Sequence, residues 1–153
     1  MSIRSVMFVC AGNICRSPIA EALFKRIAQT RPALAAIEVS SAGTIAMDGH
    51  TPIRETREVA RDEFGIDLSS HRARHAEGLT ADLILTMDHR VTREAQRLGM
   101  TGRVVMLGEY AGDGEIVEDP FGGVLEVHRV CARQIERLVE AAADRLDAEL
   151  ATV

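Results

Sequence analysis

The fold is decided by residues 4–31, which read RSVMFVCAGNICRSPIAEALFKRIAQTR. The segment from Arg4 to Val9 is short and mostly apolar, which is typical of a buried strand. Ser17, which is followed by proline, is the expected N-cap of a helix with proline in its first turn. Apolar residues then recur at helical spacing as far as Arg31, where a second proline follows. The stretch therefore predicts a strand, a tight loop and a helix.

The rest of the chain continues this alternation. Further strands are expected at 37–40, 81–87 and 103–107, and further helices from Thr51-Pro52 to Gly65, from the cap Asp88 to Gly99, and over 124–150. The segment 108–123 is rich in glycine and acidic residues and is expected to be a loop. Strands separated by helices predict right-handed crossovers, and hence an α/β fold with a four-stranded parallel sheet and helices on both faces. Ligands of such sheets bind beyond the carboxyl ends of the strands, where Cys10 is placed.

Length, charge and cysteine content narrow the class of protein. A chain of 153 residues suits one domain spanning 1–153. The net charge of −5 argues against nucleic acid or an acidic membrane surface as a partner. No stretch approaches the roughly 20 apolar residues of a spanning helix, and the N-terminus lacks a signal-peptide core, so a cytoplasmic location is expected. Three cysteines in a short chain favour thiol chemistry or packing over a disulfide framework.

The loop between the first strand and helix has the composition of an anion-binding site. Five residues separate Cys10 from Arg16, and a loop of this length can wrap around a tetrahedral oxyanion with its N–H groups pointing inward. Gly12 permits a turn that a side chain would block, and Asn13 tolerates left-handed backbone. Arg16 offers a planar fork to two phosphate oxygens. The expected phosphate-binding residues are Ala11, Gly12, Asn13, Ile14, Cys15, Arg16 and Ser17.

Cys10 is the candidate nucleophile. The helix N-terminus, the inward N–H groups and Arg16 all favour its thiolate form. Ser17 can donate a hydrogen bond to that sulfur and ease its later departure. The alternative is a buried core cysteine, which the arginine, serine and proline at fixed offsets disfavour. The residues alone therefore predict phosphoryl transfer to a cysteine.

Segment 10–18 resembles the phosphate-binding loop of the bacterial type of low-molecular-weight protein tyrosine phosphatases, with the order Cys-x-Gly-Asn-Ile-Cys-Arg-Ser-Pro intact. The resemblance extends over nearly the whole chain. Four further segments match the family in chain order: the turn 40–44, the segment 69–74 (Ser-x-His-x-Ala-Arg), the central strand and cap 82–88, and the acid loop 118–121.

The resemblance implies roles for residues outside the loop. Asp119 corresponds to the general acid, and the chemistry also requires one, because an aryl oxide leaving group needs a proton. The network that holds the loop in shape is implied to comprise Asn13, Ser17, Ser41 and His71. Cys15 matches the cysteine that can form a protective disulfide with the nucleophile. Neither a metal nor another cofactor is expected, because Arg16 and the loop amides supply the positive field.

Three alternative functions differ in substrate or chemistry. Close relatives that dephosphorylate arginine carry threonine where this chain has Ile14, which favours phosphotyrosine, although Phe121-Gly122-Gly123 fits both branches. The paired tyrosines of animal members are absent, so the expected substrate wall is Ile14, Met47 and Phe121. An arsenate reductase would need two further cysteines near 82–90, where there are none. Intact Cys10, Arg16 and Asp119 argue against a catalytically silent phosphoprotein-binding module.

The expected partner is a phosphorylated protein carrying phosphotyrosine or, in the alternative, phosphoarginine. The oligomeric state stays open between a monomer and a weak dimer. Several other polar or reactive residues show no functional pattern. Cys131 is expected to pack in the core, and Arg72, Arg74 and His75 are expected to form a solvated face. The sequence shows no pattern of ligand or catalytic partners for the other histidines, which are His50, His89 and His128.

Overall fold

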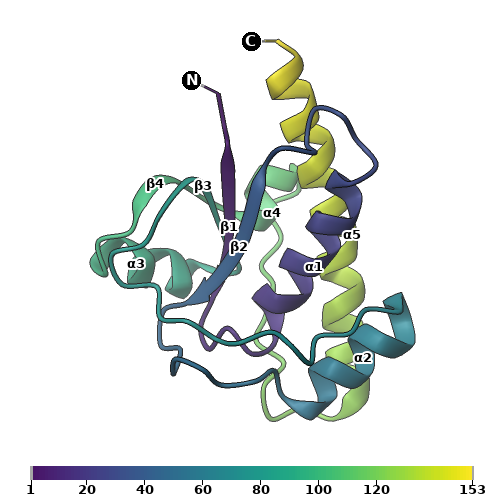
Figure 1. Ribbon diagram of the computed structural model, residues 1–153. Coiled ribbons are helices and arrows are strands. Elements are labelled where there is room, and N and C mark those ends of the chain that lie inside the picture. Colours follow the sequence, from purple (N-terminus) through teal and green to yellow (C-terminus); the bar gives the residue numbers. More distant parts are fainter. Residues whose placement is uncertain (1, 153) are drawn as a thin grey trace.

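The computed structural model describes residues 2–152 and has an α/β architecture (Figure 1). Neighbouring strands all pair in parallel, and the sheet order is β2-β1-β3-β4. This confirms the predicted four-stranded parallel sheet. In chain order the elements are β1 (Ser5–Cys10), α1 (Arg16–Ala28), β2 (Glu38–Gly43), α2 (Arg54–Phe64), β3 (Thr80–Thr86), α3 (His89–Arg97), β4 (Thr101–Met106), α4 (Leu107–Ala111) and α5 (Leu125–Ala151).

The central strand β1 serves two cores, because its side chains alternate between the faces of the sheet. Phe8 joins the larger core, which α1 and α5 cover, and its ring lies 5.7 Å from that of Phe24 on α1. Met7 and Val9 join the smaller core under α3, together with Val91. Figure 1 shows α1 and α5 side by side on one face and α3 alone on the other. Helices therefore cover both faces, as predicted.

Several predicted boundaries are wrong by a few residues. Helix α1 begins at Arg16 with Cys15 at the N-cap, so Ser17 lies inside the first turn and its hydroxyl does not cap the helix. Strand β2 continues to Gly43, and α2 begins only at Arg54. The short helix α4 occupies the start of the segment expected to be a loop. Five residues are too few for a 3.6-residue period to be visible in the sequence.

Two helix boundaries agree with their sequence signals. Gly65 ends α2 in left-handed backbone with φ 66°, as its position after the helix predicts. Asp88 caps α3, because its Oδ1 accepts a hydrogen bond of 2.8 Å from the Val91 N–H. The end of α2 and the start of α3 are thus fixed locally, and the cap helps to place Asp88 at the carboxyl end of β3.

The apolar side of α5 is buried only along part of its length. Cys131, Ile135 and Leu138 lie in the larger core, but Val124 and Val127 are 70% and 46% exposed. Val124 and Val127, at the start of the helix predicted over 124–150, are therefore not part of the core. In Figure 1 the first turn of α5 extends past the ends of the strands, where no sheet remains to cover it. Among residues 2–152, no helix combines the length and apolar character needed to cross a membrane.

Candidate active site

The predicted catalytic residues meet in one cavity at the carboxyl edge of the sheet. Cys10 is the last residue of β1, Arg16 opens α1, and Asp119 lies on the segment between α4 and α5. The cavity has a volume of about 240 Å³. Its lining residues are Cys10, Ala11, Gly12, Ile14, Cys15, Arg16, Ile45, Met47, His50, Asp119 and Phe121.

The sulfur of Cys10 lies among hydrogen-bond donors. The Asn13 N–H donates to Sγ over 3.3 Å, and the Ser17 hydroxyl lies 2.9 Å from Sγ. The Ser17 oxygen also accepts a bond of 2.7 Å from the Asn13 amide, so its own single proton remains available for the sulfur. The Ala42 carbonyl, the other acceptor within reach, is farther away at 3.5 Å. Both donors stabilise a thiolate more than a thiol, which suits a nucleophile.

Asn13 sets the shape of the loop. Its backbone is left-handed, with φ 56°, and its side chain is fully buried. The Arg74 N–H donates to its Oδ1 over 3.0 Å, which fixes the amide orientation because an N–H group can only donate. The Nδ2 group therefore donates both of its protons, to Ser17 and, over 2.9 Å, to Ser41. His71 completes the network, since its Nε2 lies 3.0 Å from the Asn13 carbonyl oxygen and donates to it.

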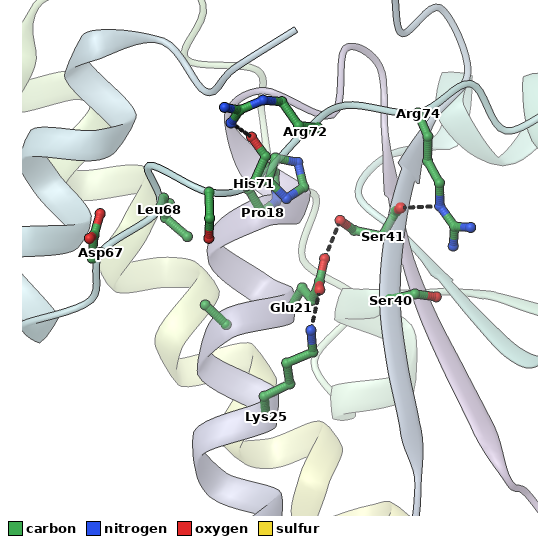
Figure 2. A pocket seen from close by; sticks show the side chains of 12 residues that line it. Pro18, Glu21, Lys25, Ser40, Ser41, Asp67, Leu68, His71, Arg72 and Arg74 are labelled. Atoms are coloured by element: carbon green, nitrogen blue, oxygen red, sulfur yellow. Dashed lines mark hydrogen bonds and ion pairs between the residues drawn. The ribbon is translucent and has the colours of Figure 1, made fainter. Parts of the chain in front are cut away.

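A second layer of contacts supports Ser41 from behind the loop (Figure 2). The Ser41 hydroxyl donates to Glu21 over 2.5 Å, and Glu21 pairs with Lys25 over 2.6 Å. The Arg74 Nε donates to the Ser41 carbonyl over 3.0 Å. Arg74 is exposed, as expected for a solvated face, but it also binds both Asn13 and Ser41. Sequence reasoning missed this structural role, because the main-chain N–H that it uses leaves no mark in the residue pattern.

The side chain of Arg16 is 2% exposed and is held by one of its terminal nitrogens. Its Nη1 donates to Asp88 Oδ2 over 2.8 Å and to the Val117 carbonyl over 2.7 Å, while Nη2 lies 3.8 Å from Asp119 Oδ2. Its Nε is buried and has no hydrogen-bond partner within residues 2–152. An anion bound in the cavity would be able to accept a hydrogen bond from this nitrogen. The contact with Asp88, 72 residues away, was not predicted.

The opposite charges of Arg16 and Asp88 stabilise each other. Burial opposes the charge on Arg16, but the neighbouring Cys10 and the hydrogen bond to Asp88 raise the pKa of Arg16 above its ordinary value. Burial likewise opposes the charge on Asp88, and the hydrogen bonds from Arg16 and from the start of α3 lower the pKa of Asp88 below its usual range. Arg16 therefore stays cationic in its buried position.

Asp119 stands at the mouth of the cavity and is 46% exposed. Its Oδ1 accepts a bond of 3.0 Å from the Phe121 N–H, which forms a turn across Pro120. The segment that carries it is anchored where the Val117 N–H donates to the Met87 carbonyl over 2.9 Å. The acid loop is thus attached to the end of β3 at one point and leaves the carboxylate accessible to a bound molecule.

The predicted wall residues Ile14, Met47 and Phe121 all line the cavity. Ile45 and His50 line it as well, and sequence reasoning assigned neither of them. Both lie in the same loop as Met47, so that loop was the available signal. This loop contains no phenylalanine, tyrosine or tryptophan, so His50 is the only residue in it with a ring system of that kind that lines the cavity.

Two further features of the site come from close packing. An added Cβ on Gly43, the last residue of β2, would overlap the Ala11 carbonyl oxygen and lie 2.8 Å from the Asn13 nitrogen, so only glycine lets the loop approach this closely. Cys15 and Cys131 are buried and free, and burial raises the pKa of each thiol to about 12. The predicted disulfide between Cys15 and Cys10 stays a prediction.

The cavity therefore combines a nucleophilic sulfur, an N–H donor directed at it, a buried guanidinium and an accessible carboxylate. This set of groups suits transfer of a phosphoryl group to sulfur. Among residues 2–152, no three His, Cys, Asp or Glu side chains lie in an arrangement that could hold a metal ion.

Comparison with known proteins shows a family match over nearly the whole chain and relatives that are similar in sequence and structure. Residues 5–152 match the model of the family described as low molecular weight phosphotyrosine protein phosphatase. The low molecular weight protein-tyrosine-phosphatase PtpB of Staphylococcus epidermidis is 34% identical over 138 residues, covering 88% of this chain and 94% of the relative. The protein-arginine-phosphatase of Bacillus subtilis is 37% identical over 146 residues, covering 92% and 95%. The crystal structure of a low molecular weight protein tyrosine phosphatase from T. tengcongensis superimposes with a TM-score of 0.78 at 34% identity, covering 92% and 97%.

Proposed function

Because the chain belongs to the low molecular weight phosphotyrosine protein phosphatase family, we propose that it hydrolyses phosphotyrosine in proteins through a phosphocysteine intermediate. The proposal rests mainly on the environment of the Cys10 sulfur. The Asn13 N–H and the Ser17 hydroxyl donate hydrogen bonds to this sulfur, and Arg16 and Asp119 line the same cavity. These groups supply the nucleophile, the anion site and the acid that the reaction requires.

In the first step the Cys10 thiolate attacks phosphorus in line with the leaving oxygen. The S–P bond forms as the P–O bond to the tyrosine ring breaks, and the Asp119 carboxylic acid gives its proton to the departing phenolate. Arg16 and the loop N–H groups hold the equatorial oxygens of the phosphoryl group. Arg16 is already oriented for this by Asp88 and Val117, so little reorganisation is needed when the substrate binds.

In the second step water replaces the sulfur. The Asp119 carboxylate takes a proton from the attacking water, the new O–P bond forms, and the S–P bond breaks to release inorganic phosphate. The Ser17 hydroxyl, 2.9 Å from Sγ, stabilises the thiolate that leaves. The enzyme returns to its starting protonation state.

The walls of the cavity support phosphotyrosine as the substrate. Ile14 and Phe121 offer apolar surface on which an aromatic ring can pack, with Met47 beside them. A relative named for its action on phosphoarginine shares more than a third of its aligned residues with this chain, so phosphoarginine is the alternative to test. The phosphoryl-transfer steps are the same for both substrates.

A paired turnover assay tests the substrate class. A phosphotyrosine peptide and a phosphoarginine peptide of otherwise equal sequence are compared with EDTA present, and the Cys10→Ser protein serves as the control. Preference for phosphotyrosine, abolished by Cys10→Ser, is expected. Preference for phosphoarginine would overturn the substrate assignment. Tight binding of the phosphopeptides without turnover of either would favour a silent binding module.

The role of Asp119 is tested by the leaving group. Asp119→Ala should lower turnover of a phosphotyrosine peptide by about 10²–10⁴, as is typical for loss of a general acid. Turnover of p-nitrophenyl phosphate should fall less, because nitrophenolate leaves without a proton. Equal losses on both substrates would contradict the assignment of Asp119 as the acid.

We further propose that the chain acts as a single domain on phosphorylated proteins in the cytoplasm. Three free cysteines without a disulfide suit a reducing compartment. Fractionation of the cells that produce the protein, followed by immunodetection, would place it directly, and recovery outside the cytoplasmic fraction would contradict this location.

A further inference from the structure

A second hollow adjoins the active-site cavity on the side of α3. Its volume is about 220 Å³, and the two hollows adjoin each other, since both are lined by Ala11, Arg16, Ile45 and Asp119. The remaining lining of the second hollow differs in character from the apolar walls of the cavity. We call these residues the α3 recess: Thr44, Asp88, Arg90, Val91 and Glu94.

Three carboxylates line the second hollow, and each lies near an arginine. Asp119 is 3.8 Å from Arg16 Nη2, and the two carboxylates of the α3 recess form closer ion pairs. Asp88 pairs with Arg16 over 2.8 Å, and Glu94 pairs with Arg97 over 2.6 Å. Arg90 is exposed and forms no salt bridge with any other residue in the range 2–152. The same holds within that range for the exposed Arg93, one turn further along the outer side of α3. Arg90 and Arg93 are therefore the charged groups at the recess and its rim that have no ion-pair partner within residues 2–152.

This local charge opposes the charge of the whole chain. With a net charge of −5, the long-range field of the protein repels an acidic peptide segment. An unpaired arginine beside the cavity reverses this locally, because interactions between close charges are screened less than those acting over a Debye length. The α3 recess is thus suited to an anionic group that arrives together with a substrate already held in the cavity.

The shared wall of the two hollows suits neighbouring residues of one peptide. An extended chain advances about 3.3 Å per residue, so the side chains one and two positions from the phosphorylated residue lie next to it along the substrate. Because the hollows share Ile45 and Asp119 as a common wall, a side chain at such a position can enter the α3 recess while the phosphorylated side chain occupies the cavity.

We propose that the α3 recess binds an aspartate or glutamate side chain that flanks the phosphorylated residue of a protein substrate, with Arg90 as its partner. This inference rests on the proposed function, since it requires a phosphorylated residue in the cavity. Arg90 acts as a specificity-determining residue and takes no part in the chemistry. Exposed ion pairs of this kind change kcat/KM by about two- to fivefold.

The test uses phosphotyrosine peptides that differ at one position. Glutamate, glutamine or lysine is placed in turn at each of the two positions before and after the phosphotyrosine, and kcat/KM is measured with the wild type, Arg90→Gln and Arg90→Glu. Arg61→Gln is the matched control, because it removes one exposed arginine from α2 that, within residues 2–152, pairs only with the adjacent Asp62. Turnover of p-nitrophenyl phosphate, which is too small to reach the recess, normalises each preparation.

At one or more positions, the wild type and Arg61→Gln should prefer glutamate over glutamine about two- to fivefold, and added salt should reduce the preference. Arg90→Gln should lose the preference, and Arg90→Glu should prefer the lysine peptide. Equal rates for all wild-type peptides, or a preference that survives both Arg90 replacements, would overturn the proposal.

Failure of the proposed function can be told apart from failure of this inference. If no phosphotyrosine peptide is turned over, the function is contradicted, and the same peptides are then bound to the Cys10→Ser protein. Tighter binding of the glutamate peptide that depends on Arg90 would still support the α3 recess. Equal binding of the glutamate and glutamine peptides would overturn it.

Discussion

Asn13 meets three requirements of the phosphate loop at once. It adopts left-handed backbone, donates from its amide to Ser17 and Ser41, and accepts from the Arg74 N–H. Asparagine is one of the few residues other than glycine that tolerates this backbone, and it alone adds an amide with both donor and acceptor capacity. The orientation of Ser17 toward Cys10 depends on this amide.

Two replacements of Asn13 separate these contributions. Asn13→Gly keeps the left-handed backbone and loses the amide, whereas Asn13→Ala loses both. Turnover should fall in both variants, and urea denaturation should find Asn13→Ala less stable than Asn13→Gly by up to about 1 kcal/mol because of backbone strain. Wild-type turnover in either variant would contradict the role of the amide, and equal stability would contradict the strain.

The pairing of Asp88 with Arg16 makes a pH-dependent contribution to stability. Since the pKa of Asp88 is lowered in the folded state, the pair stabilises the fold above the unfolded pKa of about 3.9, and this stabilisation is lost as the pH falls through the lower folded pKa. Asp88→Asn can still cap α3 but lacks the charge. Its deficit in unfolding free energy, measured by urea denaturation, should therefore be largest near neutral pH and should shrink below about pH 4.

Asp62→Asn is the control for this measurement, because in the described part of the chain, residues 2–152, Asp62 forms only an exposed pair with its neighbour Arg61. It should show little deficit at any pH. A deficit of Asp88→Asn that stayed constant with pH would contradict a charge-dependent role.

At this scale, the sequence predicted the residues that act within one loop. The spacing of Cys10, Asn13, Arg16 and Ser17 is local, and the loop can be inferred from it. The partners of Arg16 could not be predicted, because Asp88 and the Val117 carbonyl are 72 and 101 residues away and reach it only through the folded sheet.

At the scale of elements, the change from a strand-like apolar run to helical spacing located β1 and α1 correctly. The exact helix start differed, because the Ser17 hydroxyl turns toward Cys10 and does not cap α1. Strand β2 extends farther than its composition suggests, since Ser41, Ala42 and Gly43 pair in register with the end of β1. Pairing with a buried neighbour outweighs the weak strand propensity of these residues.

Helix α5 offers a stability test of the larger core. Ile135 is fully buried in the larger core, whereas Val130 is exposed on the same helix. Ile135→Ala should lower the free energy of unfolding by about 2–5 kcal/mol, because it removes buried methyl groups and leaves a cavity. Val130→Ala, measured alongside by urea denaturation, should change it by no more than about 0.5 kcal/mol. Similar losses in the two variants would contradict this account of the packing.

At the scale of the whole molecule, the position of the site follows from topology. Parallel strands place their carboxyl ends at one edge, which is why Cys10 from β1 and Asp88 after β3 lie together. The α3 recess could not be predicted in the same way. It requires α3 to lie beside the loop that follows β2, which depends on the strand order β2-β1-β3 and on the path of both loops.

The proposed mechanism requires the phosphoryl group to pass through the sulfur of Cys10. The most direct test is to mix the Asp119→Ala protein, in which both proton transfers are impaired, with p-nitrophenyl phosphate, quench in acid and map the adduct by mass spectrometry. One phosphoryl group is expected on the peptide that contains Cys10 and none on those that contain only Cys131. Turnover without an adduct on Cys10, continuing after Cys10→Ser replacement, would contradict it.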